Sequence, residues 1–231
     1  MNLDIAPHDR QAKLPHRHYH IARHWPALLA VLAIGGIFAL ISAPLSPGPR
    51  GLLLGLIVAL LVPLVISVRH GLVHLSRMLG FVILGLVTCA EAASASFLVI
   101  NLATQPLGSA DIPHDIALML LRDAALIWIV NILTFALWYW EIDSGGPGRR
   151  HREGYHSVDL VFPQLALDQT GERPWCPSFI DYLFLAFNTS TAFSPTDTLV
   201  LSRRAKLLFM TQSLISLVVL AIIAARAINT L

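Results

Sequence analysis

The chain has 231 residues, of which 55% are hydrophobic and only 13% are charged. Soluble globular domains carry about 25% charged residues, so this composition excludes an ordinary soluble domain. The net charge of +2, without a basic stripe interleaved with aromatic residues, argues against a nucleic-acid partner. The two cysteines, Cys89 and Cys176, have no CxxC partner, so we expect two unpaired thiols.

Residues 1–25 are polar and rich in histidine, and we expect them to form a cytoplasmic tail. They lack the apolar core and cleavage site of a secretory signal near the start, so the first apolar stretch is expected to be retained. Two interpretations of these histidines are compatible with the sequence: a metal-binding or pH-sensing role, or a plain polar tail at the membrane surface. The histidine spacing fits no strong zinc template. The clustered histidines are His16, His18, His20 and His24.

Five apolar stretches approach the length of about 20 residues that a helix needs to cross the hydrocarbon core. They predict an all-α integral membrane protein with about five transmembrane helices, multi-pass in the plasma (inner) membrane and in contact with lipid. We expect the first three to form a helical bundle over 26–115. The five stretches lie near 26–43, 51–68, 79–101, 116–140 and 206–229.

The basic residues outside these stretches predict orientation, because cytoplasmic loops are enriched in Lys and Arg. Ten of these basic residues fall on the side predicted to be cytoplasmic, and one, Arg50, falls on the other side. The ten are Arg10, Lys13, Arg17, Arg23, Arg69, Arg77, Arg149, Arg150, Arg152 and Arg173. Trp138, Tyr139 and Trp140 are expected to form an aromatic belt at the cytoplasmic membrane surface.

Residues 141–177 are expected to form a cytoplasmic segment between the fourth and last spans. Its first part, EIDSGGPGRRHREG, has the composition of a flexible linker. Its second part, VDLVFPQLALDQTGERPW, is compatible with a short extended piece or a hairpin at the surface.

The stretch 179–193 is too short, and too polar at its end, for a comfortable span. Irregular backbone at membrane depth survives only where protein or water covers it. We therefore predict a re-entrant pore-type half-helix, with a hairpin over 178–199 that enters and leaves on the cytoplasmic side. The alternative is that 179–197 crosses the membrane, which gives six spans with both termini inside.

The order of FIDYLFLAFNTSTAFSPTD, SRRAKLL and QSLISLVVLAIIAARAI resembles the pore module of the potassium-channel superfamily. Phe187 and Thr189 match the aromatic residue and the threonine of its pore helix. Thr191 matches the threonine just before the filter, and Asp197 matches the aspartate that closes the filter. Ser216 matches the hinge glycine of the inner helix. The resemblance covers 116–231, with 116–140 as outer helix and 204–229 as inner helix. The chain also resembles a bacterial family of multi-pass membrane proteins that share this half.

The resemblance implies a homo-tetramer that passes a small inorganic ion, but the filter itself differs. The potassium filter is a ring of backbone carbonyls whose glycines supply special backbone conformations. Here AFSPT stands in its place, without glycine and with a proline, so we do not expect potassium selectivity. The filter-like residues are Thr189, Thr191, Ala192, Phe193, Ser194, Pro195, Thr196 and Asp197.

One helical stripe of the last span is predicted to line the pore. Its residues recur at spacings of three or four and begin with two polar side chains. They are Gln212, Ser216, Val219 and Ile223.

Three ionisable residues fall inside predicted spans: Glu91, Arg122 and Asp123. Such residues are rare, face the bundle interior and usually pair. Arg122 can pair with Asp123 or reach toward Glu91. The functional interpretation is a gate, a coupling-ion site or a proton site, and the structural one is an ion pair that holds the bundle.

The sequence therefore predicts a channel-like pore protein. The alternatives are a secondary transporter, or a non-conducting membrane scaffold in which Phe193 and Pro195 close the pore module. No HExxH, GxSxG, P-loop or dinucleotide motif occurs, so we expect neither an enzyme nor a bound cofactor or metal.

Overall fold

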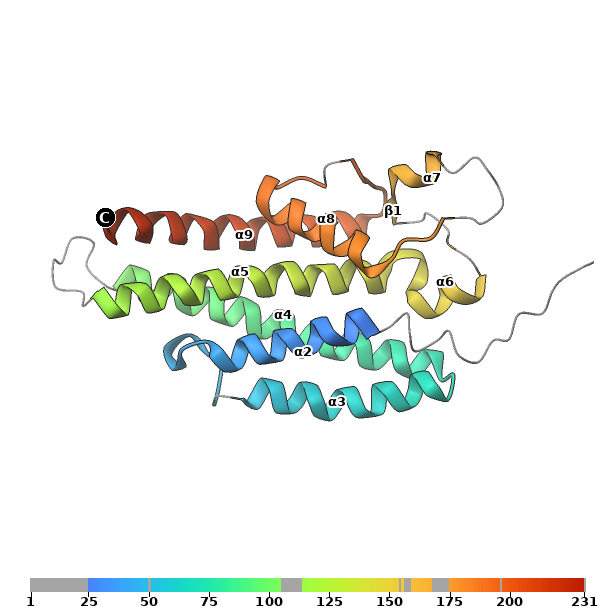
Figure 1. The fold of residues 1–231 in the computed structure, drawn as a ribbon, viewed down its shortest axis with the longest axis horizontal. Helices are drawn as coiled ribbons and strands as arrows, with labels where there is room; N and C mark the ends of the chain where they lie inside the picture. Colours follow the sequence, from blue (N-terminus) through green and yellow to red (C-terminus); the bar gives the residue numbers. More distant parts are fainter. Residues whose placement is uncertain are drawn as a thin grey trace, which may run out of the picture.

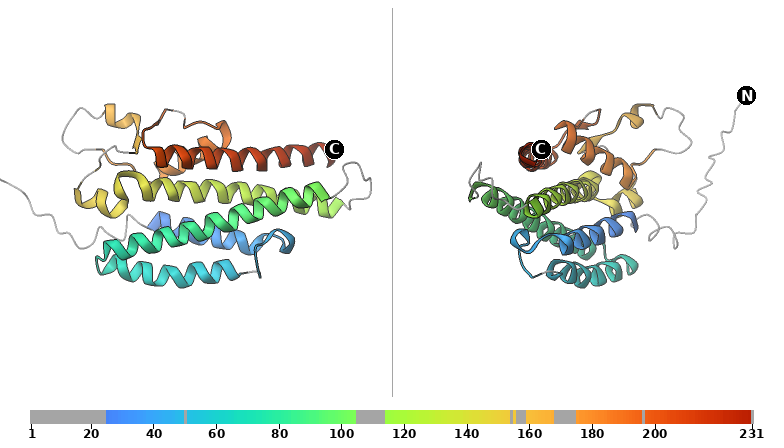
Figure 2. Two further views of the ribbon diagram at one scale, coloured as in Figure 1. Left: turned by 180° about the vertical axis from the view of Figure 1, so that it is seen from behind. Right: turned by 60° about the vertical axis from the view of Figure 1, so that its left-hand side comes forward.

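The computed structural model describes residues 25–49, 51–104, 114–153, 155, 159–167, 175–195 and 197–230. They are mostly helical, and the long helices run side by side as a bundle (Figures 1 and 2). The bundle consists of α2 (Trp25–Leu40), α3 (Leu52–Arg69), α4 (Val73–Thr104), α5 (His114–Ile142) and α9 (Arg203–Thr230). The histidines of the predicted tail and Thr196 lie outside the described residues.

Four of these helices are long and apolar enough to cross a membrane: α3, α4, α5 and α9. The prediction of a helical membrane protein is therefore confirmed. The predicted span at 26–43 forms the shorter helix α2, of 16 residues. This helix ends early because Ser42 takes extended backbone and its N–H donates to the Asp123 carboxylate at 3.0 Å.

The outer face of the bundle is apolar, as expected of helices in contact with lipid. Leu52, Leu56, Val62 and Ile66 on α3 are all exposed. The interior is filled by large side chains from several helices, with fully buried Ile34, Ile57, Ile83, Ile127 and Phe135 among them. Among helices in lipid, such side chains stabilise the bundle through close van der Waals packing and not through removal from water.

Short elements lie at both ends of the bundle, and most of them cover the end at which α8 starts. They are η1 (Ala43–Leu45) at the far end, and η2 (Asp143–Gly145), α6 (Pro147–Glu153), β1 (Leu160–Val161), α7 (Pro163–Leu167), α8 (Phe179–Ala192) and β2 (Leu199–Val200) at the near end. β1 and β2 pair antiparallel, with Leu160 opposite Val200. The extended piece predicted between 158 and 175 is thus present, and its partner strand follows α8.

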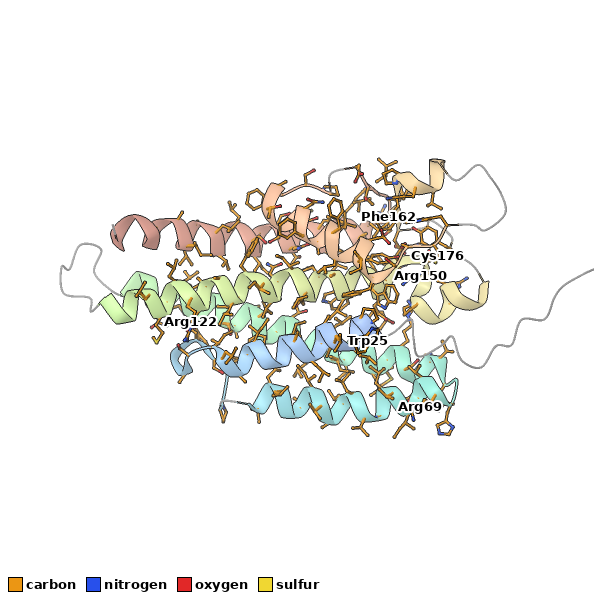
Figure 3. All side chains as sticks on the ribbon, in the orientation of Figure 1. Trp25, Arg69, Arg122, Arg150, Phe162 and Cys176 are labelled. Atoms are coloured by element: carbon orange, nitrogen blue, oxygen red, sulfur yellow. The ribbon has the colours of Figure 1, made fainter. Side chains whose placement is uncertain are left out.

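The segment predicted to be a flexible linker is ordered from Glu141 to Glu153, which corrects that interpretation. The reason is Arg150, which is buried under aromatic side chains (Figure 3). Its guanidinium donates to the carbonyls of Trp140 and Asp143 and lies 4.7 Å from the Trp140 ring and 5.3 Å from the Tyr182 ring. Hydrogen bonds and cation–π contacts together satisfy the buried charge.

The predicted aromatic belt is also corrected in part. Tyr139 and Trp140 are buried in the core and do not face a membrane surface. Tyr139 stacks on Phe209 of α9 with ring centroids 4.4 Å apart, and Trp140 meets Tyr182 edge-on. Trp138 packs against Phe81 and donates its indole N–H to Thr88 on α4 at 2.9 Å. The three rings therefore join helices.

An ion pair fastens the strand pair to the bundle. Arg204, at the start of α9, donates to both carboxylate oxygens of buried Asp159 at 2.6–2.7 Å. Burial alone would raise the pKa of Asp159, but hydrogen bonds from Arg204 and Ser202, together with the Arg204 charge, hold the pKa below its usual range. Leu201 N–H also donates to the Asp159 carbonyl at 2.9 Å.

We predict that Arg204→Ala lowers the free energy of unfolding by about 2 kcal/mol at neutral pH, because it leaves the Asp159 carboxylate buried without its charged donor. The folded pKa of Asp159 lies below the unfolded one. The contribution of the pair is therefore complete at neutral pH and is lost as the pH falls through the folded value. Denaturant unfolding in mild detergent at several pH values measures both effects.

The matched control is Arg203→Ala, at the exposed position next to Arg204. It is expected to change the free energy of unfolding by less than about 0.5 kcal/mol. Equal destabilisation by the two substitutions would contradict a specific role for the Asp159–Arg204 pair.

Candidate functional site

Helix α8 begins at a capping motif at the covered end of the bundle. The Asp181 carboxylate accepts hydrogen bonds from both the backbone N–H and the hydroxyl of Ser178, each at 2.7 Å. This arrangement fixes the first turn, and the apolar sequence FIDYLFLAF then continues the helix along α5. The pattern S-x-x-D before an apolar run is visible in the sequence and was a usable signal for this start.

Helix α8 ends after 14 residues at Phe193, which has φ 53° and ψ 28°. This left-handed conformation is unusual for a residue with a Cβ and costs about 1–2 kcal/mol. The chain then turns through Pro195 and returns to the end from which α8 started, where β2 pairs with β1 (Figure 1). The start and the return of this hairpin therefore lie at the same end of the bundle.

The side chain of Gln212 on α9 holds α8 in place. It is fully buried, and its amide nitrogen donates to the Ala186 carbonyl of α8 at 2.7 Å. Its amide oxygen accepts from the Tyr139 hydroxyl of α5 at 2.6 Å. The Gln212 backbone carbonyl also accepts from Asn131 of α5 at 3.5 Å. One residue thus connects three helices.

One turn further along α9, the hydroxyls of Ser216 and Ser190 form a buried hydrogen bond of 2.7 Å between α9 and α8. Val219, on the same stripe, is fully buried and Ile223 is partly buried. In the single chain, the four residues predicted to line a pore therefore pack inward against neighbouring helices. Leu207, Met210, Leu214 and Leu217 are exposed on the outer face of α9.

The residues predicted to resemble a filter divide into two groups. Thr189 is buried and donates to the Leu185 carbonyl of its own helix at 2.8 Å. Thr191, Ala192, Phe193 and Asp197 are exposed around the turn, and Ser194 and Pro195 are half-buried. The Thr191 hydroxyl donates to the Phe187 carbonyl at 2.9 Å. Thr191, Ala192 and Phe193 therefore form the exposed apex of the hairpin, whereas Asp197 lies on the return segment, two residues before β2.

Sequence reasoning did not single out Tyr139 or Ser190 for this site. Tyr139 carries no local signal of its partner, because Gln212 is 73 residues away. Ser190 belongs to the predicted hairpin, but its contact with Ser216 depends on how α8 and α9 cross.

The three predicted intramembrane charges do not form a single cluster. Arg122 donates to its neighbour Asp123 at 2.9 and 3.1 Å and to the Ser42 hydroxyl at 3.2 Å. Glu91 is fully buried on α4, and neither of its carboxylate oxygens has a hydrogen-bond partner among the described residues. Arg122 lies near the far end of the bundle (Figure 3). The interpretation as an ion pair that holds the bundle thus fits Arg122 and Asp123. It does not account for Glu91, which has no hydrogen-bond partner among the described residues.

A cavity of about 250 Å³ lies elsewhere, between α2, α3 with the connection before it, and α4. Its lining is mostly apolar, with Phe38, Leu53, Leu56 and Leu86 among the residues. None of the predicted site residues lines it.

Comparison of the chain with protein-family models, with curated proteins and with solved structures gave no match.

We predict that Phe193→Gly is about 1 kcal/mol more stable than Phe193→Ala. Both variants lose the ring, but only glycine adopts the left-handed conformation without steric cost. Denaturant unfolding of the two variants in the same detergent gives the difference.

The same pair of substitutions at Leu214, an exposed position inside α9, is the control. There the order is expected to reverse, with alanine about 1 kcal/mol more stable than glycine. If alanine were also preferred at position 193, the left-handed conformation would be contradicted.

Proposed function

We propose that the protein is a multi-pass protein of the plasma (inner) membrane with a re-entrant, pore-type hairpin. The hairpin consists of α8 and the return segment 193–200. In this proposal the protein is a channel-like homo-oligomer, a tetramer by analogy with the potassium-channel superfamily that it resembles. It passes a small inorganic ion but does not select potassium.

The observation that supports this proposal most is the shared end at which α8 starts and the chain returns. Cys176, before α8, lies at the same end of the bundle as Arg69 and Arg150 (Figure 3). Asp159 and Arg204 hold the returning strand there. A helix of 14 residues spans about 21 Å, less than the hydrocarbon thickness of about 30 Å. A hairpin that enters and leaves on one side fits this length.

The apex of the hairpin supports the proposal as well. Its exposed residues include the hydroxyl of Thr191, and the exposed carboxylate of Asp197 follows on the return segment. In a symmetric oligomer, such groups would meet copies of themselves at a central axis and could replace part of the hydration shell of an ion. The absence of glycine between them is the reason why potassium selectivity is not proposed.

A non-conducting scaffold is the second candidate, favoured by one observation. Gln212, Ser216 and Val219 are fully buried within the chain, so the polar stripe of α9 stabilises α8 and is not open to a path for ions. A pore would then have to be lined by the apex of the hairpin and the exposed face of α9.

We predict that Cys176 and a cysteine placed at Leu201 react from the same side of the membrane. Both lie at the ends of the hairpin, and Leu201 is exposed. The measurement is labelling with a membrane-impermeant maleimide in right-side-out and inverted vesicles, with Cys89→Ala as the background. By the distribution of basic residues, labelling is expected in inverted vesicles only.

Labelling of the two positions from opposite sides would establish a crossing segment at 179–197 and contradict the re-entrant hairpin. The Cys176→Ala variant without the added cysteine is the control for nonspecific reaction.

We also predict that the purified oligomer, reconstituted into vesicles, passes small inorganic ions, and that Thr191→Ala changes the flux or the ion preference. The reason is that Thr191 carries an exposed hydroxyl at the apex of the hairpin. Dye-based flux assays for potassium, sodium, chloride and protons measure this.

Ser96→Ala is a matched control, because the Ser96 hydroxyl also donates to a carbonyl four residues earlier, at 2.7 Å, and is also exposed, but on α4. It should leave the flux unchanged. The absence of flux for every ion tested, in a verified oligomer, would contradict conduction and favour the scaffold.

A further inference from the structure

The buried carboxyl of Glu91 lies in the interface between α4 and α5. The hydrogen bond from Trp138 of α5 to Thr88 of α4 fixes the register of the two antiparallel helices. One turn along α4, Glu91 is then level with Thr134, and a further turn brings Ser94 level with Asn131. All four of these side chains are fully buried.

This interface contains a group of buried oxygen atoms without hydrogen-bond partners among the described residues. Buried polar atoms are nearly always hydrogen-bonded, so their concentration within two adjacent turns of the interface needs an explanation, and a bound ligand is one. The atoms are Oε1 and Oε2 of Glu91, Oγ of Ser94, Oδ1 of Asn131 and Oγ1 of Thr134. The Thr134 hydroxyl faces the Glu91 carboxyl without reaching hydrogen-bond geometry.

The nearest ionisable side chains are directed elsewhere. On α4 itself, Cys89 is exposed. On α5, Asp123 is 11 residues from Thr134, about 16 Å along the helix, and binds Arg122. Glu141 lies about 10 Å from Thr134 in the other direction. Tyr139 is bound to Gln212.

The other elements that pack against α4 contribute no charge at this level. On α3 the charged residue is Arg69, at the end of the helix, and η1 has none. On α9 the basic residues are Arg203, Arg204 and Lys206 at its start and Arg226 toward its end. The nearest of these to Gln212 is Lys206, about 9 Å along the helix, and Arg226 is about 21 Å away in the other direction. Within the described part of the chain, a carboxylate at Glu91 would thus have no compensating cation.

An isolated carboxylate in an apolar interior costs several kcal/mol, so the group is stable there only with a bound cation. A single proton matches its single negative charge, and the resulting O–H can donate to one of the unpartnered oxygens. A divalent cation would leave excess positive charge beside one carboxylate. The described residues hold no group of three or more His, Cys, Asp or Glu that could bind a metal.

We propose that Glu91, with Ser94, Asn131 and Thr134 around it, forms an exchangeable proton-binding site in the α4–α5 interface. The site lies on helices that do not contribute to the α8 hairpin apex. The proposed proton site therefore does not depend on whether the proposed pore conducts ions, and the two proposals can fail separately.

The test is infrared difference spectroscopy on the full-length protein in lipid vesicles, with wild type compared to Glu91→Gln. The wild type should show a C=O band of a neutral carboxyl that the variant lacks. The band should shift on transfer from H₂O to D₂O and should disappear and return reversibly on pH titration. It should be the same in choline, sodium and potassium salts.

Two further variants separate the proposal from a general loss of structure. Thr134→Val removes the hydroxyl that faces the carboxyl and should shift the frequency of the band. Ser216→Ala, which removes a buried hydroxyl from the α8–α9 contact, should leave the band unchanged. If Glu91→Gln does not fold, the Thr134→Val shift still assigns the band.

Three results would overturn the proposal. One is a difference spectrum without a neutral-carboxyl band at any pH at which the protein stays folded. Another is a band that does not move in D₂O, since the proton would then not exchange. The third is a band that sodium or potassium removes at constant pH, because the oxygen atoms would then bind an alkali-metal ion.

Discussion

The side-chain amide of Gln212 is the contact on which the arrangement of the carboxy-terminal half depends. Helix α8 packs along α5, and it is fixed to α9 as well because Gln212 binds its backbone at Ala186. The same amide is held by the Tyr139 hydroxyl. Where the surroundings are apolar, these groups have no water to replace a lost partner. The direction of α8, the return of the chain to β1 and the exposure of the hairpin apex follow from this fixed position.

The sequence was sufficient for features that depend on local pattern. Apolar length predicted the long helices, and the break after FIDYLFLAF predicted a short helix followed by a turn. Features that depend on distant partners could not be predicted. The glycines and charges around Arg150 suggested flexibility, but Trp140 and Tyr182 order the segment. The stripe that begins at Gln212 was recognisable, but periodicity does not say whether a stripe faces its own chain or a neighbour.

The buried charges of this protein are stabilised in different ways at different levels of the bundle. Near one end, Asp123 is held by Arg122 and by the Ser42 N–H. At the other end, Asp159 is held by Arg204, and Arg150 by aromatic rings and carbonyls. Glu91, between these ends, has no hydrogen-bond or ion-pair partner among the residues that the structure describes. Asp123, Asp159 and Arg150 therefore hold elements of the bundle together, whereas Glu91 does not, although the sequence around each of them is similarly apolar.

The early end of α2 has a consequence for the surrounding lipid. With 16 residues α2 is about 24 Å long, and α3 with 18 residues about 27 Å, whereas the apolar part of α5, residues 118–142, reaches about 38 Å. In Figure 1, α2 and α3 lie on the side of the bundle away from α9. In the proposed multi-pass arrangement, one flank is therefore shorter than a hydrocarbon core of about 30 Å and the other is longer. Hydrophobic mismatch of opposite sign on the two flanks favours a tilted molecule and a bilayer that is thinner beside α2 and α3.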